Sequence, residues 1–151
     1  MKPAALIDSN VIIAALAEAH EHHAPSVALF TGPRPAAFAI AAHSYAEAYS
    51  TLTRRGDHSP FRFSAEEAWA ALDSLRAVTA LVGLTPAQSV EAVRDYARGG
   101  GIGPRLYDRL IGEVAVAQGI PAVITWNTGH MRGLFPRLEV VTPVGFAATT
   151  G

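Results

Sequence analysis

Three acidic residues and one amide residue, Asp8, Glu47, Asp108 and Asn127, have the best case for joint chemistry in this sequence. Asp8 directly follows the apolar run "AALI", and Asn127 lies just beyond the apolar run "PAVIT". Clustered carboxylates repel one another unless a cation lies between them, and hard oxygen ligands suit Mg²⁺ or Mn²⁺ rather than zinc. Such ions neutralise a phosphodiester and lower the pKa of a water that attacks phosphorus. We therefore expect metal-assisted phosphodiester chemistry if these side chains meet.

Two of the four residues also have a purely structural interpretation as helix caps. Asp8, Ser9 and Asn10 precede the apolar run "VIIAALAEA", and such side chains accept hydrogen bonds from the free N–H groups of a helix start. Glu47 lies three residues after Ser44, which is the spacing of a capping box. Each of these residues can therefore be a cap, a member of the acidic site, or both.

Asp108 and Asn127 have equally simple alternative roles. Asp108 lies at the margin of the apolar face of its predicted helix, where it can pair with Arg105 or Arg109. A surface pair of this kind contributes only about 0 to 1 kcal/mol. Asn127 can be a turn residue in "WNTGH". One shared pocket nevertheless explains the presence of all four residues better than four unrelated structural roles do.

Alternating strands and helices are the pattern that would bring the four residues together. Buried strands are predicted over 4–7, 36–42, 79–84, 121–125 and 138–143, and helices over 11–19, 43–55, 64–78, 86–98 and 104–119, with a last helical turn after 143. The segment "HEHHAPSVALF" is predicted as a polar turn before a short apolar segment. This order favours an α/β fold with a mostly parallel sheet covered on both faces. Residues that follow parallel strands emerge at one edge of the sheet.

Composition limits the possible classes of protein. The chain has 151 residues, of which 50% are hydrophobic and 17% charged, so we expect one domain over 1–151. The net charge of −1 provides no global field for nucleic acid, so a polyanion has to be held by a local patch. The absence of cysteine excludes disulfides, thiolate zinc sites and a cysteine nucleophile. We expect no secretion signal and no membrane span, and we expect a cytoplasmic location.

Four segments of the chain resemble the successive motifs of PIN-domain ribonucleases, especially the VapC-type toxins of bacterial toxin–antitoxin pairs. They are "LIDSNVIIAAL", "SYAEAYSTLTR", "RLYDRLIGEVAVAQGIPAVITWNTGHM" and "LEVVTP". The resemblance covers nearly the whole chain, and residues 56–98 match least distinctively. It implies a compact three-layer α/β/α domain with a parallel sheet. It also implies an acidic pocket that binds Mg²⁺ or Mn²⁺ and cleaves RNA, so that the toxin inhibits translation.

The resemblance assigns roles to individual residues. Asp8, Glu47 and Asp108 match the metal ligands of the family. Asn127 lies where many relatives carry Asp and some carry Asn, and a neutral amide can ligate or orient water but adds no negative charge. Thr125 matches a hydroxyl common beside that position, Ser9 and Asn10 fall within the first motif and can orient Asp8 or a water, and Glu113 is a further candidate on a more solvent-facing helical position.

Other polar and aromatic residues allow two interpretations each. The histidines of "HEHH" suggest either a metal site or a solvated turn, and they lack the HExxH spacing that aligns two imidazoles. Five arginines can contact phosphates or pair with nearby acids: Arg54, Arg55, Arg105, Arg109 and Arg132. Trp69 and Trp126 can stack on a base or pack in the core.

A group of aromatic residues around 54–63 is a candidate docking surface. Its members are Tyr45, Tyr49, Phe61, Phe63 and Trp69. Aromatic side chains are enriched in interface cores, although they can equally pack on the sheet within one chain. We expect the chain to be a homodimer, with self-association or antitoxin docking at this surface. Resemblance to VapC-type toxins implies a small VapB-type antitoxin that is buried on this region and sends a basic side chain toward the acidic pocket.

Three rival functions follow from the same motifs. An apolar strand that ends in Asp also begins haloacid-dehalogenase-like phosphatases and response-regulator receivers, but both use a lysine near the phosphoryl group, and the only lysine here is Lys2. A PIN-like module that binds RNA or a partner without cutting is a second alternative. A housekeeping RNA-processing nuclease is the third.

Overall fold

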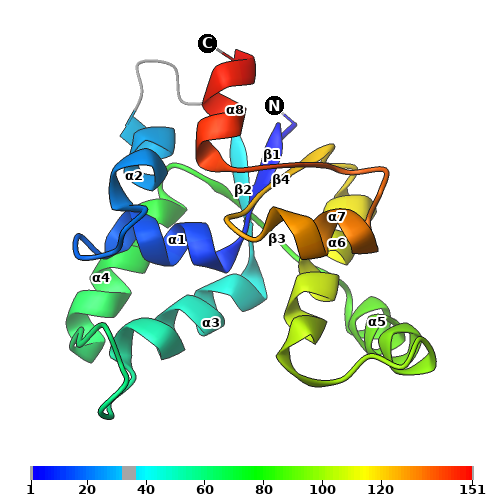
Figure 1. Cartoon of the computed structure of the whole chain (residues 1–151), viewed down its shortest axis with the longest axis horizontal. Helices are drawn as coiled ribbons and strands as arrows, with labels where there is room; N and C mark the ends of the chain where they lie inside the picture. Colours follow the sequence, from blue (N-terminus) through cyan, green and yellow to red (C-terminus); the bar gives the residue numbers. More distant parts are fainter. Residues whose placement is uncertain (1, 32–36, 151) are drawn as a thin grey trace.

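A single five-stranded parallel sheet forms the centre of the molecule, as the sequence predicts (Figure 1). The computed structural model describes residues 2–31 and 37–150, so the first residue of the strand expected over 36–42 lies outside them. The strand order is β3-β2-β1-β4-β5, and every neighbouring pair is parallel. The strands are short: β1 (Ala5–Ile7), β2 (Phe38–Ala41), β3 (Ala80–Val82), β4 (Ala122–Ile124) and β5 (Glu139–Val141).

The helices alternate with the strands along most of the chain. They are α1 (Ser9–Leu16), α2 (His23–Thr31), α3 (Ala42–Thr53), α4 (Ala65–Arg76), α5 (Pro86–Arg98), a 3₁₀ turn (Gly103–Arg105), α6 (Leu106–Gln118), α7 (Thr128–Leu134) and α8 (Pro143–Thr150). The sequence analysis did not predict α2 or α7 as helices, because neither segment has a clear apolar periodicity. In the part of the chain that the structure describes, no helix is both long and apolar enough to cross a membrane.

Local signals explain where several helices begin and end. Ser64 and Glu67 form a capping box at the start of α4, and Thr85 and Gln88 form another at the start of α5. Gly119 ends α6 in the left-handed conformation, with a φ of 65°. These three boundaries agree with the sequence prediction because each depends on residues within one or two helical turns.

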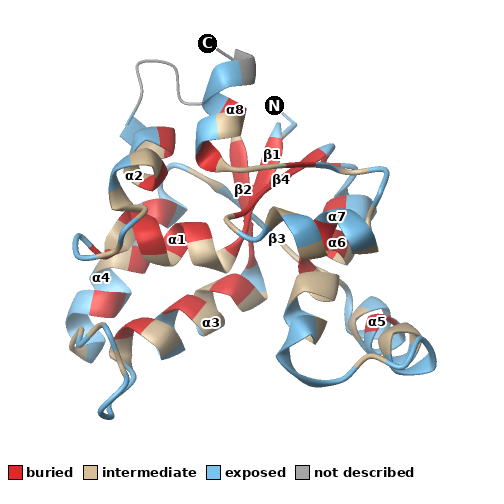
Figure 2. Cartoon of the chain, in the orientation of Figure 1, coloured by how far each residue is buried: buried red, intermediate tan, exposed pale blue. Residues whose placement is uncertain are grey.

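Two hydrophobic cores fill the two faces of the sheet and make the fold three-layered. Alternate strand residues point to opposite faces, so Ile7 packs with α1, α2, α4 and α8, whereas Leu6 packs with α6 and α7. Figure 2 shows the central strands β1, β2 and β4 as buried, whereas the edge strands β3 and β5 are partly exposed. Helix α5 packs mainly on α6 and buries only Ala92 among its own residues. The α/β/α architecture inferred from the sequence is confirmed.

Gly112 marks a close approach within the second core, and its replacement tests that packing. A Cβ atom at Gly112 would overlap the Phe135 ring. We expect Gly112→Ala to lower the free energy of unfolding by about 1–3 kcal/mol through overpacking. Gly129→Ala is the matched control, because a Cβ there meets nothing within 4 Å. Urea unfolding followed by circular dichroism measures both, and equal stability of the two variants would contradict the packing inferred at Gly112.

Candidate active site

Asp8 lies at the carboxyl end of β1 and is only 4% exposed. One carboxylate oxygen accepts a hydrogen bond from the backbone N–H of Ser9 at 2.7 Å, and the other accepts one from the Thr125 hydroxyl at 2.9 Å. The first contact makes Asp8 the N-cap of α1, so the capping interpretation is confirmed. The second contact ties the same carboxylate to the far end of the sequence, which a cap alone does not require.

The Thr125 hydroxyl links three segments around Asp8. It follows β4, is fully buried, and donates its hydrogen to Asp8. It accepts hydrogen bonds from the side-chain amide of Asn10 at 3.0 Å and from the backbone N–H of Asn127 at 3.1 Å. Asn10 also accepts a bond from the backbone N–H of Trp126 at 3.1 Å. One donor and two acceptor positions are all that a hydroxyl offers, so this network holds Asp8 in one orientation.

Glu47 approaches the same place from α3, which begins directly after β2. The N-cap of α3 is Ala41, and the Ser44 hydroxyl is buried inside the helix without a hydrogen-bond partner among the described residues. The capping-box interpretation of Ser44 and Glu47 is therefore wrong, because the helix begins three residues earlier than such a box requires. Glu47 Oε1 is buried and likewise has no hydrogen-bond partner in the described chain, and it lies 3.8 Å from Nε2 of His43.

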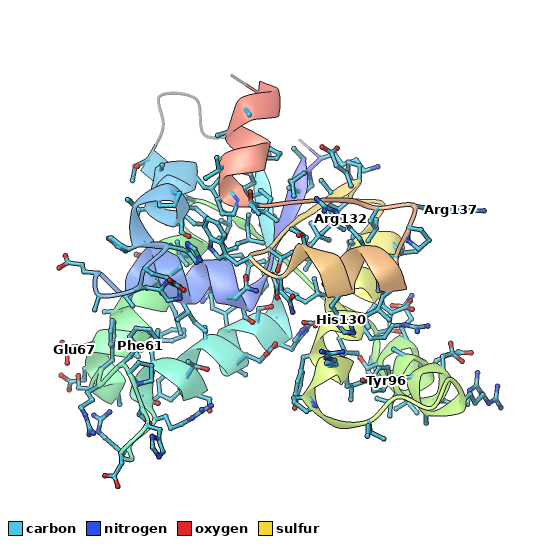
Figure 3. All side chains as sticks on the ribbon, in the orientation of Figure 1. Phe61, Glu67, Tyr96, His130, Arg132 and Arg137 are labelled. Carbon is cyan, nitrogen blue, oxygen red and sulfur yellow. The ribbon has the colours of Figure 1, made fainter. Side chains whose placement is uncertain are left out.

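Asp108 reaches the site from the first turn of α6. Its Oδ2 atom lies 2.7 Å from Nδ1 of His130, which belongs to α7. Figure 3 shows His130 between α7 and the beginning of α6. The expected alternative, a pair with Arg105 or Arg109, does not form, because Arg109 instead donates to Glu113 at 2.9 Å.

The pKa shifts show that the three carboxylates interact electrostatically. Burial, together with the negative charge of Asp108, raises the pKa of Asp8 to about 6, against the hydrogen bonds from Thr125 and Ser9. Burial raises the pKa of Glu47 to about 7, and the charges of Asp8 and Asp108 act in the same direction, against a hydrogen bond from the Ser9 side chain. Three acidic groups, from the end of β1, α3 and α6, therefore lie close enough together for the charge of Asp108 to disfavour the charged forms of Asp8 and Glu47.

The chemistry of this set fits a hard divalent cation. Within residues 2–31 and 37–150, no three His, Asp or Glu side chains are arranged closely enough to hold one ion together. The donors are nevertheless carboxylates, one buried oxygen of Glu47 is left without a hydrogen bond, and burial together with repulsion raises the pKa values of Asp8 and Glu47. A cation between them would convert this repulsion into attraction, and Mg²⁺ or Mn²⁺ prefers such oxygen ligands.

The remaining candidates differ in how close they come to this centre. Ser9 contacts Asp8 and Glu47, and Asn10 and Thr125 belong to the Asp8 network. Asn127 is the N-cap residue of α7, but its exposed side chain makes no capping hydrogen bond. Glu113 pairs with Arg109 and lines a separate cavity between α5 and α6, and its charge is not among the causes of either carboxyl shift.

Sequence reasoning missed His43, Tyr107 and His130. His43 lies four residues before Glu47, and the helical spacing of these two residues was a signal that could have identified it. His130 has no such local relation to Asp108, because 22 residues separate them. Tyr107 directly precedes Asp108 and is 44% exposed, with its ring 6.5 Å from that of His43.

Some of the arginines proposed as phosphate contacts bond to other residues of the described chain, and others do not. Arg132 donates twice to the backbone oxygen of Val140, and Arg55 donates to backbone oxygens of its own loop. Arg109 is held by Glu113 and lies over the Phe135 ring. Arg54 and Arg105 are exposed and make no hydrogen bond or ion pair with any described residue. Only these two of the five remain free for an external phosphate.

The "HEHH" histidines act as packing and hydrogen-bonding groups around α1 and α2. His22 stacks on Trp126 with ring centroids 4.0 Å apart, and the Trp126 indole N–H donates to Ser26 at 3.0 Å. His20 accepts a bond from the backbone of His22 and stacks near Phe61 at 6.0 Å. His23 lies 2.9 Å from the backbone oxygen of Ala14. Trp126 thus packs within the chain, as one of its two interpretations expected.

The aromatic group around 54–63 is split between the interior and the surface. Tyr45, Phe61 and Phe63 pack partly buried against the cores, as the intramolecular alternative predicted. Tyr49 and Trp69 are exposed, Trp69 at 52%. A surface for another protein can use only these last two rings without rearrangement of the loop.

The parallel sheet and the acidic residues at its carboxyl edge define an α/β protein with a candidate site at the ends of its strands, and comparison with known families identifies the family. The PIN domain family model matches residues 5–132. The chain therefore belongs to the PIN domain family. No curated protein sequence matches it.

Solved structures with this fold are similar over nearly their whole length. VapC20 of Mycobacterium tuberculosis, described as a sarcin–ricin loop cleaving toxin, is 18% identical, with a TM-score of 0.67, and the match covers 89% of this chain and 98% of that one. VapBC2 of Rickettsia felis, bound to promoter DNA, is 16% identical, with a TM-score of 0.60 and coverage of 90% and 96%. PAE2754 of Pyrobaculum aerophilum is 16% identical, with a TM-score of 0.62 and coverage of 100% and 98%. At these identities the likeness is one of fold.

Glu47→Gln is expected to change the pH dependence of stability in EDTA. The pKa of Glu47 rises from 4.5 to about 7 on folding, so in this window the folded state keeps a proton that the unfolded state has released. The free energy of unfolding therefore falls as pH rises through the window. Gln removes the charge and keeps the shape of the side chain. The free energy of unfolding of the variant should therefore be higher than that of the wild type by on the order of 1–2 kcal/mol at about pH 8, and equal to it at about pH 4.

Urea unfolding at both pH values measures the difference. Asp73→Asn, at an exposed position on α4 that pairs only with Arg76, is the matched control and should shift stability equally at both. A Glu47→Gln difference that did not depend on pH would show that the fold does not disfavour the charged form of Glu47.

Proposed function

We propose that this chain is a Mg²⁺- or Mn²⁺-dependent endoribonuclease that acts as the toxin of a toxin–antitoxin pair and inhibits translation by cleaving RNA. The observation that carries the proposal is the electrostatic coupling of Asp8, Glu47 and Asp108 at the carboxyl edge of the sheet. Three mutually repelling acids serve no purpose in a module that only binds RNA, since they would repel its phosphates. Membership of the PIN domain family and the fold likeness to VapC20 support the same function.

The chain's own residues supply orientation and charge. Asp8, Glu47 and Asp108 would hold the cation, which when bound neutralises the phosphodiester and lowers the pKa of the attacking water. Thr125 fixes the carboxylate of Asp8, and His130 fixes that of Asp108. Asn127 carries an exposed amide beside this edge, where it is available to orient a water. Two independent anchors thus keep two acids from rotating away from each other.

Asp8→Asn is expected to lower RNA cleavage by at least about a hundredfold, because it removes the charge of a buried metal ligand while keeping its size. The measurement is cleavage of a structured RNA by purified protein with Mg²⁺ or Mn²⁺, and with EDTA in a parallel reaction. Circular dichroism checks that the variant is folded.

Asp73→Asn serves again as the control, because it removes an exposed carboxylate outside the site, and it should cleave as the wild type does. Undiminished cleavage in excess EDTA would reject the metal mechanism. Cleavage by Asp8→Asn at the parental rate would reject the site assignment.

The partner that we propose is a small VapB-type antitoxin, with the toxin itself as a homodimer in the cytoplasm. The solved complexes VapBC2 of Rickettsia felis and VapBC-1 of Haemophilus influenzae are similar in fold to this chain. An uncompensated acidic centre attracts a guanidinium, which can pair with the same carboxylates that bind the cation. The exposed rings of Tyr49 and Trp69 offer apolar contact area on the α3 and α4 side of that centre.

Expression of the chain alone is expected to arrest growth, and coexpression of a small neighbouring gene is expected to restore it. Asp8→Asn expressed alone should be harmless, because arrest requires the acidic centre. Light scattering should give about twice the chain mass of 15.9 kDa. A monomer that cleaves RNA but is harmless alone would favour the housekeeping nuclease, and a folded protein that binds RNA without cutting would favour the binding module.

A further inference from the structure

Trp126 lies in the turn between β4 and α7, with a residue of the candidate site on each side of it. The preceding residue, Thr125, donates its hydroxyl hydrogen to Asp8, and the following residue, Asn127, carries an exposed amide. The ring of Trp126 is half-buried and packs against the core that contains α1 and α2. The position of Trp126 therefore affects where the carboxyl end of β4 places Thr125.

Two contacts hold the side chain of Trp126 on the segment that begins α2. The indole N–H donates a hydrogen bond to the hydroxyl of Ser26 at 3.0 Å, and the ring stacks on that of His22, with centroids 4.0 Å apart and planes tilted by 14°. Ser26 is fully buried, so bulk water does not replace this bond when it is lost. Trp126 is thereby fixed to α2 by one directional bond and one ring face.

The backbone of Trp126 is fixed by Asn10, which also bonds to Thr125. The Trp126 N–H donates to Asn10 Oδ1 at 3.1 Å, and the amide nitrogen of Asn10 donates to the Thr125 hydroxyl at 3.0 Å. Another acceptor for the Thr125 hydrogen, Asn10 Oδ1, is 3.4 Å away and already bonded to Trp126, whereas Asp8 is at 2.9 Å. The Trp126 N–H thus determines which way round the Asn10 amide lies, and through it where the Thr125 hydrogen points.

These bonds affect cation binding because they end at a proposed metal ligand. A carboxylate that can rotate has to be restrained when it binds an ion, and that restraint lowers the affinity. Residues that orient a metal ligand directly change metal affinity by about 10- to 100-fold. Trp126 lies one step further from the ion, because it acts through Asn10 and Thr125. Its effect is therefore expected at the lower end of this range.

We propose that Trp126 is a positioning residue for the acidic centre, which holds Asn10 and Thr125 in the arrangement that fixes Asp8 for a divalent cation. The inference rests on the proposed metal-dependent function and adds a residue that contacts neither the cation nor the phosphodiester. Through Trp126 the orientation of Asp8 also depends on the position of α2. Because such coupling is reciprocal, a bound cation should in turn stabilise the contacts of Trp126 with Ser26 and His22.

Mn²⁺ affinity in the absence of RNA tests the proposal without requiring catalysis. Isothermal titration calorimetry should show that Trp126→Ala binds Mn²⁺ about tenfold more weakly than the wild type. Ser26→Ala keeps the indole ring and removes only its hydrogen-bond acceptor, so it should bind Mn²⁺ about three- to fivefold more weakly. Trp126→Phe keeps a ring against His22 and removes the indole N–H, so it should match Ser26→Ala.

A double variant and a control separate positioning from a general loss of stability. Ser26→Ala/Trp126→Phe should bind Mn²⁺ no more weakly than either single variant, because both substitutions remove the same bond. Ile120→Val is the matched control, because Ile120 is 1% exposed and precedes β4 at the end opposite Thr125. This variant should be less stable than the wild type and should bind Mn²⁺ equally well.

Hydrogen exchange in EDTA gives a second measurement, which needs no cation. NMR should show that Ser26→Ala speeds the exchange of the backbone N–H groups of Trp126 and Asn127 by about threefold or more, because their bonds within the Asp8 network open more often. The backbone N–H of Ile120, which is bonded at the other end of β4, should exchange at the wild-type rate.

Several results would overturn the role of Trp126 even if the wild type binds Mn²⁺ and cleaves RNA. They are wild-type Mn²⁺ affinity in Trp126→Ala or in Ser26→Ala, additive losses in the double variant, an equal loss in Ile120→Val, and unchanged exchange at Trp126 and Asn127 in Ser26→Ala. If Trp126→Ala does not fold, Ser26→Ala and Trp126→Phe decide the question. A folded wild type that binds no Mn²⁺ would overturn the proposed metal-dependent function as well.

Discussion

Repulsion among three carboxylates at one edge of the sheet is the constraint around which the rest of the site is arranged. Asp8 is almost wholly buried, and its charged form is disfavoured by burial and by the charge of Asp108. The fold offsets part of this cost with hydrogen bonds from Thr125 and Ser9 to Asp8. The part of the cost that these hydrogen bonds do not offset is the reason for proposing that a cation binds beside the carboxylates.

The strand order determines where this edge site can form. The chain moves outward from β1 to β2 and β3 on one side, and then places β4 and β5 on the other side of β1. Ligands of open α/β sheets bind at such a reversal, at the carboxyl ends of the strands. Asp8 after β1 and Thr125 after β4 meet there across 117 residues of sequence. The Asp8–Thr125 hydrogen bond is thus a direct product of the topology.

Charge on this molecule is organised locally rather than globally. The chain carries a net charge of −1, so attraction of a polyanion depends on individual free cations near the acids. Arg54 and Arg105 are free, whereas Arg55, Arg109 and Arg132 hold loops and helices together. Arg105 lines a cavity with His130, which contacts Asp108, and Arg54 lines a cavity with Glu47. Each free arginine therefore shares a cavity with a residue of the acidic centre or with a direct neighbour of one.

The sequence by itself determined the parallel α/β architecture and the helix boundaries at Ser64, Thr85 and Gly119, because periodicity and caps are local patterns. Its motifs also proposed the four residues of the candidate site. Only the tertiary structure decided which alternatives hold. It showed that Ser44 is not a helix cap and that Asp108 contacts His130 instead of an arginine. It also placed the ring of Tyr107 near that of His43. These contacts join separate helices, and their geometry depends on how the helices pack against the sheet, which no local pattern encodes.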